Sequence, residues 1–92
     1  MERVFVAEGN LDMASVKRNL AVFDELAKAD QSVVVDLQRV SRIDAAGLGA
    51  LVSLKRRLSE SGHDMRIINT NGQPSELMNK LGVTGILIRH RH

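Results

Sequence analysis

The part of the chain most suited to chemistry is a run of small residues that follows a single acidic side chain. The acidic residue is Asp44, and the small residues are Ala45, Ala46, Gly47, Gly49 and Ala50. At the start of a helix, backbone N–H groups left bare by such residues can bind an anion such as phosphate. Phosphate-binding loops, however, carry Gly-x-x-x-x-Gly-Lys-Ser/Thr or Gly-x-Gly-x-x-Gly. Only Gly47-Leu48-Gly49 is present, and Asp44 would repel an anion, so the signal for a nucleotide site is weak.

Residues for metal binding or nucleophilic catalysis do not form a recognisable pattern. The chain has no cysteine, which excludes a thiolate metal site and a disulfide framework. His63 falls in an expected turn, whereas His90 and His92 belong to the C-terminal tail, so the histidines do not have the spacing of metal ligands. We therefore expect a non-enzymatic protein with no metal and no other cofactor.

Length and composition predict one small domain with an aliphatic core. The 92 residues are 43% hydrophobic and 26% charged, and the aromatic residues are Phe5 and Phe23. The formal net charge is +2, and the basic residues form no stripe with interleaved aromatics, so nucleic-acid binding is not expected. No apolar run approaches the roughly 18 residues that cross a bilayer, and the N-terminus has no secretory signal. The sequence therefore predicts a cytoplasmic protein that does not insert into a membrane.

Hydrophobic periodicity predicts strands that alternate with helices. Expected strands cover residues 3–7, 32–37 and 65–69, with a last short strand or apolar tail at 85–88. Expected helices cover residues 12–27, 45–60 and 77–81, the last closed by Gly82. Turns or links are expected at residues 8–10 and 38–41, and turn or cap roles at Gly9, Asp12, Asp36 and Asp44. This order indicates an α/β fold with a parallel or mixed sheet, in one domain over residues 1–88 followed by a tail at 89–92.

The expected helix over residues 45–60 contains two glycines, although each costs about 1 kcal/mol relative to alanine. At 100° per residue, Leu48, Leu51, Val52 and Leu58 share a core-facing side, and a stripe of small residues lies opposite. The stripe consists of Ala46, Gly49, Ala50, Ser53 and Arg57. Either it packs tightly against another element of the same fold, or it is exposed and a partner docks on it. The candidate partner-binding residues are Asp44, Ala45, Ala46, Gly47, Gly49, Ala50, Ser53 and Arg57.

Several short motifs, taken in order and spacing, resemble the STAS family, the domain shared by anti-sigma-factor antagonists and sulfate transporters. Residues 9–12 (GNLD) resemble the family's early G-x-L-D turn, and residues 35–37 (VDL) its central strand. Residues 43–49 (IDAAGLG) resemble its D-S-S-G-L-G signature. Residues 65–69 and 77–82 also fall in place, so the resemblance covers nearly the whole chain. It implies a STAS-like mixed sheet of four to five strands flanked by about three helices, with no active site of its own.

Two features depart from this family pattern. The family's anti-sigma antagonists are switched by a partner serine kinase, which phosphorylates the second serine of D-S-S-G. That position is Ala46 here, and alanine has no hydroxyl to accept a phosphate. Family members also often have an additional N-terminal strand, whereas only eight residues precede Gly9. A free sheet edge could pair with a second chain, so a homodimer or edge docking is one expectation.

The resemblance implies a protein partner and leaves its class open. The first interpretation is an anti-sigma-factor antagonist-like module that binds an anti-sigma factor or a related serine-kinase switch protein, and that cannot be turned off at Ala46. The second is the STAS subunit of a phospholipid-trafficking ABC transporter, which contacts the ATPase subunit; residues 39–44 (RVSRID) resemble the corresponding stretch there. The third, nucleotide binding by the domain alone, is disfavoured because no lysine stands near Gly47-Leu48-Gly49.

Overall fold

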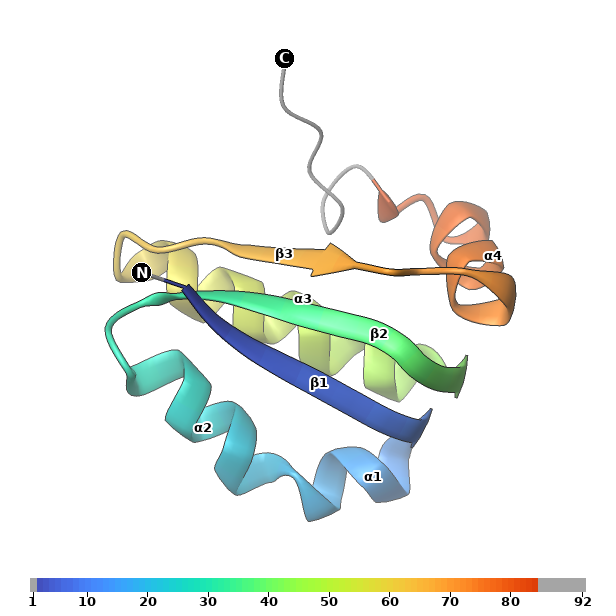
Figure 1. Ribbon diagram of the computed structural model, residues 1–92, viewed down its shortest axis with the longest axis horizontal. Coiled ribbons are helices and arrows are strands. Elements are labelled where there is room, and N and C mark those ends of the chain that lie inside the picture. Colours follow the sequence, from blue (N-terminus) through green and yellow to red (C-terminus); the bar gives the residue numbers. More distant parts are fainter. Residues whose placement is uncertain (1, 85–92) are drawn as a thin grey trace.

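The computed structural model describes residues 2–84, which form a parallel sheet with helices packed around it (Figure 1). The strands are β1 (Glu2–Leu11), β2 (Ser32–Ile43) and β3 (Met65–Ile68), in the spatial order β1-β2-β3. The helices are α1 (Met13–Arg18), α2 (Leu20–Lys28), α3 (Ala45–Glu60) and α4 (Gly72–Lys80). Both strand pairs are parallel, and each connection between them passes through helices, as parallel neighbours require.

The core lies on the sheet face that the helices cover. Alternate side chains of β2, such as Val33 and Val35, are fully buried in the same apolar cluster as Leu51 and Leu58 of α3. Phe23 of α2 joins this cluster, and α1 and α2 run beside β1 in Figure 1. The core is therefore largely aliphatic, as the composition predicts, and α3 packs beside α1 and α2.

The expected mixed sheet of four to five strands is wrong for the described residues, which form three parallel strands. The segment at residues 85–88, expected as a strand or tail, and the tail at 89–92 lie outside the described residues. β1 and β2 are longer than predicted, because they pair through both the expected turn at residues 8–10 and the expected link at 38–41. β3 ends at Ile68, one residue earlier than predicted. Two register shifts along this pair allow the continuation, and Gly9 has a φ of +74°.

The helices also differ from the prediction, because four are present where about three were expected. The helix expected over residues 12–27 is divided at Asn19, where φ is −107° and ψ is 14°. Asp12 begins α1 as its N-cap, with its Oδ1 accepting a hydrogen bond from the Ser15 N–H at 2.9 Å. At the end of α4, Gly82 follows the C-cap Leu81 with a φ of +71°, so the predicted closing glycine is present.

None of the helices in the described part of the chain combines the length and the apolarity that a bilayer crossing needs.

Candidate interaction site at helix α3

The site is built around Asp44, the residue that joins β2 to α3. Its backbone is extended, and its Oδ1 accepts a hydrogen bond from the Gly47 N–H at 2.9 Å. Its own N–H donates to the carbonyl of Leu11 at 3.2 Å, which ties the start of α3 to the end of β1. Asp44 is therefore the N-cap of α3, and its carboxylate is engaged by the helix N-terminus.

Gly47 is explained by packing inside the domain. It is buried, and a Cβ atom at this position would overlap the backbone carbonyl of Leu11 and approach the side chain of Ile43 at 3.1 Å. Only a residue without a side chain allows α3 to approach β1 this closely. Gly49 differs, because a Cβ atom there would meet nothing within 4 Å. Of the two glycines, Gly47 has a structural reason and Gly49 is open to solvent.

A side chain from α4 fastens the strand end that precedes Asp44. The Gln73 carboxamide accepts a hydrogen bond from the Ile43 N–H at 2.8 Å and donates to the Ile43 carbonyl at 3.0 Å. Through these two bonds, the amide pairs with the edge of β2 much as another strand would. No feature of the sequence points to this contact, because Gln73 is separated from Ile43 by the whole of α3 and β3.

Between the helix starts lies a small polar hollow. Its volume is about 210 Å³, and it is lined by Asn10, Asp12, Arg42, Ile43 and Asp44. The carboxylates of Asp12 and Asp44 already accept hydrogen bonds from the N-termini of α1 and α3. Within residues 2–84, no group of three histidine, cysteine or carboxylate side chains is placed to hold a metal ion.

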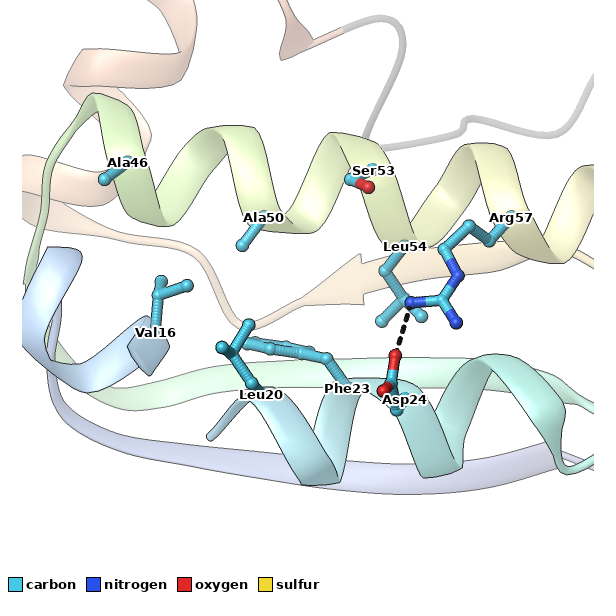
Figure 2. A pocket seen from close by; sticks show the side chains of 9 residues that line it. All are labelled: Val16, Leu20, Phe23, Asp24, Ala46, Ala50, Ser53, Leu54 and Arg57. Carbon is cyan, nitrogen blue, oxygen red and sulfur yellow. Dashed lines mark hydrogen bonds and ion pairs between the residues drawn. The ribbon is translucent and has the colours of Figure 1, made fainter. Parts of the chain in front are cut away.

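A second, more apolar groove separates α3 from α1 and α2 (Figure 2). The α3 wall consists of the small side chains of Ala46, Ala50 and Ser53, with Leu54 below them. The opposite wall consists of Val16, Leu20 and Phe23, and the groove holds a cavity of about 210 Å³. Leu20 is 57% exposed, so apolar surface is open to solvent here. The Arg57 guanidinium closes one end by donating to the Asp24 carboxylate at 2.9 Å.

The structure separates the predicted stripe into parts with different surroundings. Ala46, Ala50, Ser53 and Arg57 are half-buried and line the groove, so they do not face freely outward as the helical wheel suggested. Ala45 and Gly49 are exposed and lie outside the groove, whereas Gly47 is buried. The reason is that α1 and α2 pack beside α3, and its small side chains allow their approach. The sequence did not single out Val16, Leu20 and Phe23, the other groove residues, as candidates for the site.

Asp36, expected in a turn or cap role, lies within β2 and connects two segments. Its Oδ1 accepts hydrogen bonds from the Gln38 N–H at 2.8 Å and from the Asn69 side-chain amide at 3.1 Å. Both bonds hold the pKa of the Asp36 carboxyl below its ordinary value, and the bond from Gln38 has the larger effect. The second bond fixes the loop after β3, where Asn69 has a φ of +61°.

A STAS domain model matches residues 2–91, which is nearly the entire chain. The chain belongs to the STAS domain family. The three parallel strands and the capped α3 after the second strand are therefore the STAS arrangement in this protein.

Solved structures of other STAS proteins share this fold. A protein from Thermotoga maritima, described as an anti-sigma factor antagonist, matches with a TM-score of 0.81 and 19% identity, over 92% of this chain and 74% of that one. A sulfate transporter family protein from Wolinella succinogenes has a TM-score of 0.77 and 19% identity, over 94% of this chain and 70% of that one. The unphosphorylated anti-sigma factor antagonist SpoIIAA has a TM-score of 0.70 and 18% identity, over 97% and 79%. No curated protein matches the sequence significantly. At identities this low, the structural matches show that the fold is shared and nothing more.

Proposed function

We propose that this STAS domain is a non-enzymatic, cytoplasmic protein–protein interaction module of the anti-sigma-factor antagonist type. Its partner is an anti-sigma factor or a related serine-kinase switch protein, which docks on the groove between α3 and α1–α2. The solved relatives described as anti-sigma factor antagonists support this class of partner.

The groove carries the proposal. An exposed apolar side chain, Leu20, faces alanine methyl groups of Ala46 and Ala50 across a hollow large enough for a side chain of a partner. Energetically dominant contacts in protein interfaces are of this type, with an apolar anchor in a desolvated pocket surrounded by weaker contacts. The Arg57–Asp24 pair at the end of the groove would form part of the polar rim.

Ala46 determines how such an interaction is regulated. In the family signature this position carries the serine that a partner kinase phosphorylates, and a phosphate there would add about two negative charges beside Asp44. The Ala46 methyl lines the groove and cannot accept a phosphate. We infer that binding through this surface is constitutive.

The decisive experiment compares two substitutions in the groove with a matched one beside it. Ala46→Asp and Ala50→Arg place charge inside the groove, whereas Ala45→Asp adds the same charge as the first at an exposed position outside it. We expect all three variants to fold, the first two to lose at least tenfold in affinity for an anti-sigma factor by calorimetry, and Ala45→Asp to bind normally. Normal binding by both groove variants would exclude the groove as the interface.

A second candidate is a STAS subunit that binds the ATPase of a phospholipid-trafficking ABC transporter. The alanine at position 46 favours it, because such a structural role needs no phosphorylation switch. A sulfate transporter family protein is also among the structural relatives. Co-purification with an ABC ATPase, lost in Ala50→Arg and retained in Ala45→Asp, would select this alternative over the first.

A further inference from the structure

The outer edge of β1 is a second surface on which a partner can act. Among the described residues, β1 pairs with β2 alone, so its other edge has backbone N–H and C=O groups without a strand beside them. Val4 and Val6 on this strand are 59% and 43% exposed. Proteins usually protect such an edge with proline, with lysine or by making the strand short. Residues 2–11 contain neither proline nor lysine.

A hollow of about 200 Å³ follows this edge. Its lining includes the four consecutive residues Phe5, Val6, Ala7 and Glu8, together with Leu11, Ser15 and Asn19. Successive side chains of a strand point to opposite faces, so four consecutive residues can line one hollow only along the backbone edge. The opposite wall comes from α1, which lies beside β1 in Figure 1. The hollow is therefore a channel between a strand edge and a helix.

Ser15 gives this channel an unused hydrogen-bonding group. The residue is 4% exposed, and its Oγ has no hydrogen-bond partner. The backbone groups of Ser15 are engaged, because its N–H donates to Asp12 and its carbonyl accepts from the Asn19 side chain. A buried hydroxyl without a partner is costly, and the great majority in folded proteins are paired. Ser15 lines the channel, and a ligand that reaches its hydroxyl there would satisfy it.

The charges along β1 specify what the channel fits. Glu2, Val4, Val6 and Glu8 share one face of the strand. Each glutamate meets one arginine, Glu2 with Arg66 and Glu8 with Arg39, and its carboxylate has acceptor sites left for a further donor. An added strand with the order basic, apolar, apolar, basic on this face would be complementary in either chain direction.

We propose that the β1 edge binds an extended segment of a partner protein, which adds as a fourth strand and gives the Ser15 hydroxyl its hydrogen bond. The segment carries basic residues opposite Glu2 and Glu8, apolar residues opposite the two valines, and polar residues on the face toward Ser15. A second copy of this chain fits less well. Antiparallel pairing of residues 2–8 in two copies would oppose Glu2 with Glu8, and the flanking helices α1 and α2 would approach each other.

The test uses the full chain and the peptide acetyl-Lys-Thr-Val-Thr-Val-Thr-Lys-amide, which has this alternation. A peptide of the same composition in scrambled order, and one with glutamate at both ends, are the controls. Titration followed by amide NMR should show saturable shifts at residues 3–8 and at Ser15 with the first peptide alone. Equal binding of the control peptides, shifts confined to the α3 groove, or no saturable shift would each overturn the proposal.

Two variants assign the contacts. Ser15→Ala should weaken the peptide roughly three- to tenfold, the value of one hydrogen bond, and leave the unfolding temperature unchanged or raised, because the free hydroxyl has no partner to lose. The double variant Val4→Ser/Val6→Ser should lower the affinity for the peptide by about tenfold or more. Leu20→Ser, in the groove of α3, should bind the peptide normally, which separates this site from the proposed docking groove. A destabilised Ser15→Ala, or a dimer that the peptide dissociates, would contradict the assignment to a partner segment.

Discussion

At the scale of single residues, the two glycines of α3 have opposite environments, and this difference can be measured. Gly47→Ala should destabilise the domain by about 1–3 kcal/mol, because the new methyl group overlaps the Leu11 carbonyl at the junction of α3 and β1. Gly49→Ala should stabilise it by about 0.5–1 kcal/mol, because its new methyl group enters open space in a helix interior. Urea denaturation of the two variants measures both effects. Equal stabilities would show that α3 can move away from β1 at no cost.

Gln73 provides a second prediction at this scale. Gln73→Ala removes both hydrogen bonds to Ile43 and leaves a partly buried strand end unpaired, so we expect a loss of about 1–3 kcal/mol. Gln73→Glu should also destabilise, because a carboxylate cannot donate to the Ile43 carbonyl. Gln38→Ala, at an exposed position of β2, is the control. Hydrogen exchange at the Ile43 amide should accelerate in both Gln73 variants, and unchanged exchange would refute the role given to the carboxamide.

At the scale of elements, the helix caps are not equivalent. Asp44 caps α3 with a side-chain hydrogen bond, whereas Asn71 at the start of α4 makes no such bond. Asp44→Ala should therefore cost about 1 kcal/mol, and Asn71→Ala no more than a few tenths. Thermal unfolding monitored by circular dichroism measures both costs. If the two substitutions cost the same, the Asp44 bond adds nothing to the stability of α3.

The sequence predicts those elements whose signal is local. The continuous β-branched run in β2, the cap at Asp44 and the glycine after α4 are all visible in short windows of sequence, and the structure contains them. The ends of the strands are set by pairing between β1 and β2, which carries both strands through residues with turn propensity. The division at Asn19 was missed because the apolar spacing continues across it without a break.

The candidate site was only partly predictable for a related reason. A helical wheel orders the residues of α3 around its axis, but it does not say which side neighbouring helices occupy. Ala46, Ala50 and Ser53 do lie on one side of α3, as the wheel predicts. That side faces α1 and α2 across the groove and is not freely exposed. The contact of Gly47 with Leu11 and the bonds from Gln73 join segments distant in sequence, so no local pattern could reveal them.

At the scale of the whole molecule, charged side chains connect strands that are not neighbours. The Arg66 guanidinium of β3 donates through Nε and Nη2 to both carboxylate oxygens of Glu2 in β1, at 3.2 and 3.1 Å, so the pair spans the central strand β2. Such bidentate pairs are the stronger kind of charged hydrogen bond. On the same sheet, Asp36 holds Asn69 in the loop after β3. These two carboxylates connect β3 and the loop that follows it to the other two strands of the sheet.

Their titration gives the molecule a predictable response to acid. The bonds from Arg66 lower the pKa of Glu2, and those from Gln38 and Asn69 lower the pKa of Asp36. For each group the unfolded chain binds more protons at low pH, so its stabilising contribution is complete above the ordinary values of 4.5 and 3.8 and disappears as the pH falls through the lowered ones. Urea midpoints should therefore fall more steeply between pH 5 and about 3 in the wild type than in the double variant Glu2→Gln/Asp36→Asn. The control Glu60→Gln, at the exposed end of α3, should behave as the wild type. Parallel pH profiles for the wild type and the double variant would show that other carboxylates govern acid unfolding.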